Sequence, residues 1–194
     1  MNKLLFVSFY TEGYYEEIFN RFLRPSLEKF ELKNFVYRLP NLHNWFQNGK
    51  YKTKIILDAL KKTQDDIVFL DADAEIIKTP ELFYIIPNNY NIAIHCLDWE
   101  KFWHNKEGQS KREVLSGTIY LRNNPDTIKF VEEWNNLNQT SQEWGQKILQ
   151  ALLTKITYYD LPIEYCRILK VGESIPVNAV IVQHQASRQG RSKS

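Results

Sequence analysis

The sequence is poor in cysteine, in net charge and in long apolar runs, and each shortage excludes a class of protein. Two cysteines, Cys96 and Cys166, are too few for the disulfide framework of a small secreted scaffold. A formal net charge of +2 is too small to indicate binding to nucleic acid or to a membrane surface. We find no apolar run of membrane-spanning length and no secretory h-region near the first residues. We therefore expect a cytoplasmic protein with reduced thiols and no membrane span.

Nothing in the sequence divides the chain into separate units. We find no internal repeat, no low-complexity segment and no linker, and 194 residues are enough for one domain with a sizeable core. We therefore expect a single domain over residues 1–188, followed by a flexible basic tail over residues 189–194.

Strand and helix patterns alternate over the first seventy residues. Short apolar runs predict strands at residues 4–10, 35–39 and 67–70. Apolar residues three and four positions apart predict helices over 15–23 and 50–62. Thr11 is the expected N-cap of the first helix, Pro25 ends or kinks it, and residues 41–49 form a loop. This β-α-β-α-β order implies right-handed crossovers and a parallel sheet.

The second half of the chain continues with less regular signals. Thr79 and Pro80 predict the start of a short helix, and Asn124 with Pro125 predicts a longer one. Thr140 and Glu143 match a capping box for a helix that ends near Leu153. Strands are expected at residues 91–95, 117–121, 158–161 and 179–183, with a long loop over residues 96–113.

Two carboxylates follow the third predicted strand directly. The buried run Ile-Val-Phe-Leu at residues 67–70 leads into Asp71 and Asp73, which point the same way if the chain stays extended. Like charges this close need a cation or strong hydrogen bonds between them, and oxygen ligands suit Mg²⁺ or Mn²⁺. The alternative is a solvated turn in which both aspartates cap backbone N–H groups.

The order of these features resembles the nucleotide-diphospho-sugar transferase family, the GT-A type of glycosyltransferase. The Asp-x-Asp at residues 71–73 follows two β-α units, and a basic segment, residues 50–54, opens the helix before it. Residues 116–123 resemble the later strand on the acceptor side, and residues 180–184 resemble the late strand whose terminal histidine joins the metal in glycogenin-like members. The resemblance implies an α/β, Rossmann-like GT-A fold with a mainly parallel central sheet flanked by helices.

The resemblance also implies a role for individual residues. The implied ligands of Mn²⁺ or Mg²⁺ are Asp71, Asp73 and His184. The implied contacts of the donor nucleotide are Ser8, Phe9, Tyr10, Lys54, Asp71 and Arg188. The implied acceptor or sugar contacts are Ser116, Gly117, Thr118 and Gln146.

Some of these assignments have a plainer alternative. Phe9 is equally a core residue, Lys54 and Arg188 are equally surface charges, and His184 is equally a hydrogen-bonded histidine at a strand end.

One position departs from the family pattern. Many members carry an acidic residue followed by glutamine at the start of a late helix, whereas this chain has Gly145 before Gln146. The catalytic carboxylate is therefore unassigned, with Asp98 and Glu143 as candidates, and the choice between retention and inversion at the anomeric carbon stays open. The tryptophans at positions 99, 103 and 144 are candidates for stacking on sugar faces.

The resulting hypothesis is a metal-dependent glycosyltransferase that uses a uridine diphosphate sugar and an unknown acceptor. One alternative is a haloacid-dehalogenase-like phosphatase, in which the first aspartate is the nucleophile. Against it, that motif opens the first strand in such enzymes, and Glu75 occupies a position where they have Thr or Val. The other alternative is a relative that binds nucleotide sugars without catalysis.

Overall fold

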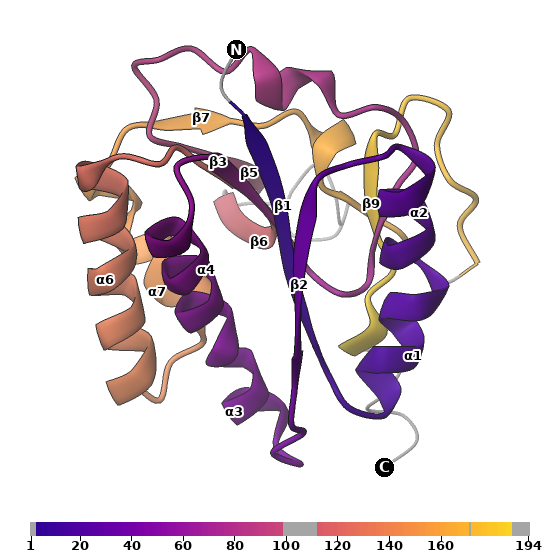
Figure 1. Ribbon diagram of the computed structural model, residues 1–194, viewed down its shortest axis with the longest axis horizontal. Helices are drawn as coiled ribbons and strands as arrows, with labels where there is room; N and C mark the ends of the chain where they lie inside the picture. The colour runs from indigo at the N-terminus through magenta and orange to yellow at the C-terminus, as the bar shows by residue number, and fades with distance from the viewer. Residues whose placement is uncertain (1–2, 99–111, 171, 188–194) are drawn as a thin grey trace.

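The central feature of the structure, a computed structural model, is a six-stranded sheet with strand order β2-β1-β3-β6-β5-β7 (Figure 1). The structure describes residues 3–98, 112–170 and 172–187. The sheet strands are β1 (Leu4–Thr11), β2 (Asn34–Leu39), β3 (Asp66–Leu70), β5 (Ile92–Asp98), β6 (Arg112–Leu121) and β7 (Tyr158–Asp160). Strand β1 runs parallel to β2 and β3, β7 runs parallel to β5, and β6 is antiparallel to both β3 and β5. The mainly parallel sheet predicted from the alternating pattern is confirmed.

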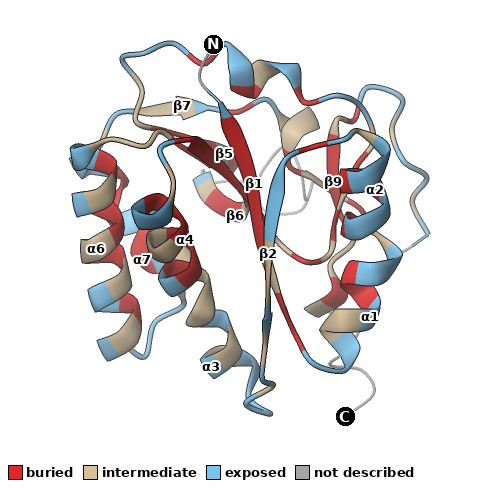
Figure 2. Cartoon of the chain, in the orientation of Figure 1, coloured by how far each residue is buried: buried red, intermediate tan, exposed pale blue. Residues whose placement is uncertain are grey.

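Alternation along the strands divides the core between the two faces of this sheet. Leu5 and Val7 of β1 pack in one cluster with residues of α4 (Tyr51–Lys62), α6 (Pro125–Thr140) and α7 (Gly145–Leu152). Leu4 and Phe6 pack in a second cluster with residues of α1 (Tyr14–Arg21) and α2 (Leu23–Lys29). Successive side chains of a strand point to opposite faces, so an unbroken apolar run must be covered on both sides. Figure 1 shows these helix groups on opposite sides of the sheet, and Figure 2 shows the buried residues concentrated in the strands between them.

The first helices differ in detail from the prediction. Thr11 is not an N-cap, because it is the last residue of β1, and Gly13 with φ of 84° precedes α1. The break between α1 and α2 falls at Phe22, before Pro25, which lies in the first turn of α2, where a missing N–H is tolerated. The expected loop over residues 41–49 contains the short helix α3 (Trp45–Gly49), whose cap Asn44 accepts a hydrogen bond from the Gln47 N–H.

Strands β5 and β6 are antiparallel neighbours, and each is longer than the strand predicted there. The loop expected over residues 96–113 is wrong at both ends, because Cys96, Leu97 and Asp98 pair with Val114, Glu113 and Arg112. Residues 99–111, which include Trp99 and Trp103, lie outside the described residues.

The predicted capping box is also wrong. Thr140 is the last residue of α6 and its hydroxyl donates to the Asn136 carbonyl, while exposed Glu143 forms an ion pair with Lys147. Helix α7 starts later, at Gly145, and ends at Leu152, where the 3-10 helix η2 (Leu153–Lys155) follows. The Asn124 cap predicted for α6 is confirmed, since its side chain accepts from the Thr127 N–H.

A second, small sheet pairs residues 181–183, late in the sequence, with residues 74–76, directly after the aspartate pair. Its order is β4 (Ala74–Ile76), β9 (Ile181–Gln183), β8 (Arg167–Ile168). The 3-10 helix η1 (Glu81–Tyr84) follows β4, with Pro80 as its cap residue and not as its first helical residue, and η3 (Ile163–Tyr165) precedes β8. The strands β4 and β8 were not predicted. Within the described ranges, no helix has the length and apolar character needed to cross a membrane.

Candidate active site

Two adjoining cavities lie where β1 and β3 end. The larger has a volume of about 320 Å³ and the smaller about 170 Å³. Both are lined by Lys52, Asp71 and Asp73, and also by Trp45, Gly49 and Ser187. The carboxyl edge of a parallel sheet is the usual place for ligands in open α/β folds. The Asp-x-Asp pair therefore lies at the junction of the two cavities.

Lys52 contacts this junction with its ammonium group. Its Nζ lies 2.8 Å from Oδ1 of Asp71 and donates to the carbonyl and the hydroxyl of Ser116, at 2.9 and 3.1 Å. Lys54, the lysine chosen from the sequence, is exposed and lines neither cavity. Lys52 lies three and four residues before the buried Ile55 and Ile56, on the inward face of α4. That spacing was a signal in the sequence that could have identified it.

Asp73 is held in an environment that disfavours its charge. Desolvation of the carboxyl, with the nearby negative charge of Asp71, raises the pKa of Asp73 to about 6. Hydrogen bonds to backbone N–H groups and the charge of Lys52 oppose this in part, and the Ala186 N–H donates to Asp73 Oδ2 at 2.8 Å. Two carboxylates that repel each other beside a cavity are a donor set that a hard divalent cation fits, because the cation stabilises both charges.

The ring of His184 contacts Glu75 and Phe22. Its Nε2 is 2.7 Å from Glu75 Oε2, and its ring stacks on Phe22 with centroids 3.7 Å apart. Its backbone N–H donates to the Asp73 carbonyl at 3.0 Å. Over the described parts of the chain, no three His, Cys, Asp or Glu side chains form a group able to hold a metal. The assignment of His184 as a third ligand therefore stays a prediction.

The end of β1 supplies much of the smaller cavity. Phe9, Tyr10 and Thr11 line it, together with Tyr15 and Asn48. Phe9 also packs against Phe69 of β3, so it belongs to the core as well as to the cavity wall. Ser8 lies buried behind this wall, and neither its hydroxyl nor that of Thr11 has a hydrogen-bond partner among the described residues. Arg188 lies outside the described residues.

The predicted acceptor residues line the larger cavity, with one exception. Ser116, Gly117 and Gln146 all face it, and Gln146 Oε1 accepts from both the N–H and the hydroxyl of Ser116 at 3.2 Å. Thr118 is fully buried behind this wall, where its hydroxyl accepts from Gln183 Nε2. A side chain at position 117 would meet Gln183 at 2.9 Å, so the glycine permits close packing of β6 on β9.

Glu113 is a third carboxylate that lines the larger cavity, besides Asp71 and Asp73. Its Oε1 accepts from Gln146 Nε2 at 2.8 Å. Neither Asp98 nor Glu143 lines either cavity. Glu113 was missed because residues up to 113 were assigned to a loop. Extending the predicted strand backwards would have found it, since residues 113, 115 and 117 share one face of a strand.

Comparison with known proteins identifies the fold and the family. A glycosyltransferase involved in the glycosylation of the major capsid of PBCV-1 matches with a TM-score of 0.68 at 15% identity, over 98% of each chain. Mouse xyloside xylosyltransferase 1 matches with a TM-score of 0.57 at 11% identity, over 95% of this chain and 98% of that one. No curated protein matches by sequence. The profile of the nucleotide-diphospho-sugar transferase family matches residues 42–183. The phosphatase alternative is thereby overturned, and the chain belongs to the nucleotide-diphospho-sugar transferase family, the glycosyltransferases of GT-A fold.

Proposed function

We propose that the protein transfers a sugar from a nucleoside diphosphate sugar to an acceptor hydroxyl in a reaction that depends on Mn²⁺ or Mg²⁺. The observation that carries the proposal is the position of Asp71, Asp73 and Lys52 at the junction of two cavities. A nucleotide sugar is an elongated molecule with its charge in the middle, and this arrangement matches it. A uridine diphosphate sugar is our choice of donor on the family resemblance alone.

Asp71 and Asp73 would hold the cation through carboxylate oxygens, the ligands that Mn²⁺ and Mg²⁺ prefer. When bound, such a cation neutralises charge on the departing diphosphate and so improves the leaving group. Asp71 Oδ1 is already paired with Lys52 and Asp73 Oδ2 with the Ala186 N–H, which orients both carboxylates before any ligand arrives.

Lys52 would stabilise the same diphosphate from the protein side. Its ammonium is held by the carbonyl and hydroxyl of Ser116, so it needs little rearrangement to face a phosphate oxygen. The nucleoside would occupy the smaller cavity beside Phe9 and Tyr10, and the sugar and acceptor would occupy the larger one beside Ser116 and Gln146.

The test is a thermal-shift panel of nucleoside diphosphates and nucleotide sugars, each with and without Mn²⁺. A ligand at a hundred times its Kd stabilises the folded state by about 2.7 kcal/mol, which raises the Tm by a few degrees. We expect a shift that needs both Mn²⁺ and a uridine nucleotide, and we expect Asp73→Asn to abolish it.

The matched control is Asp126→Asn, the same chemical change at an exposed position in the first turn of α6. It should keep the shift. A shift that Asp73→Asn retains would overturn the assignment of the aspartate pair, and a shift with a different base would overturn the uridine assignment.

A further inference from the structure

Two partly exposed tryptophans lie together at the larger cavity. Trp45 of α3 and Trp144, the residue before α7, are 39% and 46% exposed, and their ring centroids are 5.1 Å apart at an interplanar angle of 67°. Both line the larger cavity, and only Trp45 also lines the smaller one. A large apolar ring is normally buried, so two of them left accessible beside a cavity indicate a surface that a ligand covers.

The segments that carry these rings are tied together by polar contacts. The ammonium of Lys50, between α3 and α4, donates to the carbonyls of Gln139 and Ser141 at 3.1 and 3.3 Å. The Gln139 side chain donates back to the Lys50 carbonyl at 3.1 Å. At the start of α7, the Gly145 carbonyl accepts from the buried Trp134 Nε1 at 2.8 Å. The tryptophan pair is therefore presented by braced segments, as a preorganised binding surface requires.

The same cavity offers planar polar groups. Glu113 and Gln146 are joined by a hydrogen bond of 2.8 Å, and Gln146 is oriented in turn by Ser116. Gln185 lines the cavity from the opposite segment, after β9. Carboxylate and amide groups present several acceptor and donor sites at fixed angles, which suits the adjacent hydroxyls of a sugar ring. The apolar C–H face of such a ring suits an indole.

The β6 wall of the cavity is poorly suited to the addition of a peptide strand. Strand β6 turns an edge toward α7 between Arg112 and Ser116, and side chains already cover it. The N–H groups of Val114 and Ser116 donate to Gln150 and Gln146, and the carbonyls of Arg112 and Ser116 accept from Gln150 and Lys52. A peptide that added a strand here would find these backbone groups occupied.

Resting on the proposed function, we infer that the acceptor is a carbohydrate, whose ring packs on the Trp45 and Trp144 indoles while its hydroxyls bind Glu113 and Gln146. The acceptor hydroxyl then approaches the donor sugar from the side of the larger cavity. Trp144 and Glu113 are the residues that select the acceptor, because they line the cavity away from the shared junction.

The experiment is saturation-transfer-difference NMR with UDP and Mg²⁺ on the full chain. The probes are the methyl glycosides of glucose, galactose, xylose and N-acetylglucosamine, and a short serine-containing peptide serves as the competing acceptor class. We expect at least one glycoside to bind through its ring protons. Trp144→Ala should weaken that binding about tenfold, with Trp144→Phe intermediate. Glu113→Gln should weaken it while UDP binding is unchanged.

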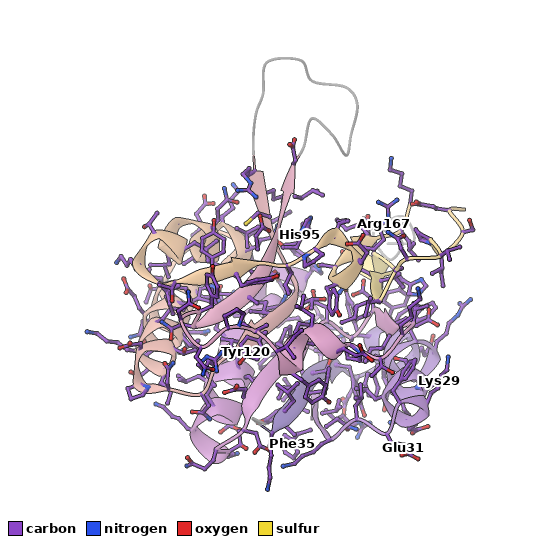
Figure 3. The ribbon with its side chains drawn as sticks, turned by 90° about the horizontal axis from the view of Figure 1, so that it is seen from above. Lys29, Glu31, Phe35, His95, Tyr120 and Arg167 are labelled. Carbon is purple, nitrogen blue, oxygen red and sulfur yellow. The ribbon has the colours of Figure 1, made fainter. Side chains whose placement is uncertain are left out.

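Phe35→Ala is the matched control for loss of an exposed aromatic ring. Phe35 is 49% exposed on the edge strand β2 and lines neither cavity. Figure 3 shows it away from Arg167, the residue between the cavity-lining Cys166 and Ile168. It should bind the glycoside like the wild type.

The outcomes separate the two proposals. If UDP binds but no glycoside does, whether or not the peptide binds, the carbohydrate acceptor is excluded and the transferase proposal stands. If a glycoside binds and Trp144→Ala leaves its Kd unchanged, the tryptophan assignment is wrong. If a glycoside binds in a Trp144-dependent manner but no nucleotide does, the carbohydrate site stands and the proposed donor fails.

Discussion

Lys52 Nζ lies 2.8 Å from Asp71 Oδ1, and the same ammonium also bonds the carbonyl and hydroxyl of Ser116. One side chain thus links the carboxyl end of β3 to the wall of the larger cavity on β6. Because these contacts fix the ammonium beside both cavities, removing it should lower the binding affinity of any ligand that carries a phosphate there.

We therefore predict that Lys52→Met weakens UDP binding by about 10- to 100-fold, since a hydrogen bond to a charged group contributes about 1.5–3 kcal/mol. Isothermal titration with UDP and Mn²⁺ measures this directly. Lys54→Met, two residues along the same helix and exposed, should bind UDP like the wild type. Equal loss in both variants would mean that general surface charge, and not the position of Lys52, attracts the nucleotide.

The pKa of Asp73, raised to about 6, predicts how Mn²⁺ binding depends on pH. A raised carboxyl pKa means that the metal-free folded state favours the protonated acid. The contribution of Asp73 to the stability of the fold is therefore fully present below pH 3.8, the ordinary pKa, and is lost as the pH rises through about 6. Mn²⁺ needs the ionised carboxylate and must displace that proton. We expect the Mn²⁺ affinity to be constant above about pH 7 and to fall by up to tenfold per unit below pH 6.

Titration of Mn²⁺ between pH 5 and 8 checks this, and proton release can be followed by repeating it in buffers of different ionisation enthalpy. Asp126→Asn should show the same pH profile as the wild type. An affinity that does not change between pH 7 and pH 5 would contradict the assignment of Asp73 as a ligand.

The sequence predicted the parts of this fold that depend on strong apolar patterns. The runs at the cores of β1 and β3 have no plausible place except a sheet covered on both faces, and Asp71 and Asp73 are conspicuous because they end such a run. The failures occur where polar contacts decide the structure. Glu113 pairs with Leu97 in a strand, but it stands between the predicted loop and the predicted strand and was assigned to the loop.

Weak local signals explain the other errors. The capping box at Thr140 failed because Thr140 is the last residue of α6 and its hydroxyl donates to the Asn136 carbonyl. Helix α3 has five residues and no buried side chain, so neither periodicity nor propensity reveals it. Lys52 and Lys54 differ only in the helix face they occupy, which decides which of them reaches the cavity.

The close packing around Gly145 leaves no room for a methyl group, so adding one should lower the stability of the fold. An ideal Cβ at this position would lie 2.9 Å from Asn138 Oδ1, and Asn138 is itself held by its hydrogen bond to the Thr53 hydroxyl at 3.0 Å. We expect Gly145→Ala to lower the free energy of unfolding by about 1–3 kcal/mol, as overpacking commonly does. Urea denaturation followed by circular dichroism measures this change.

Gly49→Ala provides the matched control. No heavy atom lies within 4 Å of a Cβ built at Gly49, and this residue ends α3. The same substitution there should be neutral or stabilise the fold by up to about 1 kcal/mol, because alanine restricts the unfolded chain. Equal destabilisation of the two variants would show that the contact with Asn138 has no part in the effect.

The last prediction separates the structural role of His184 from the role that the family resemblance implied. Its Nε2 contacts Glu75 and its ring covers Phe22, so the imidazole supports the β4–β9 region from which Asp73 and Ala186 are positioned. We expect His184→Ala to lower the free energy of unfolding by about 1 kcal/mol or more, because it removes both a hydrogen bond and a stacked ring. The Mn²⁺ affinity, measured by titration on the folded variant, should stay within about twofold of the wild type.

His95→Ala is the control, since it removes another partly buried histidine, bonded to the Leu161 carbonyl, that lines neither cavity. A tenfold or larger loss of Mn²⁺ affinity in His184→Ala, absent in His95→Ala, would restore the imidazole as a ligand and would require its ring to leave Glu75 when the cation binds.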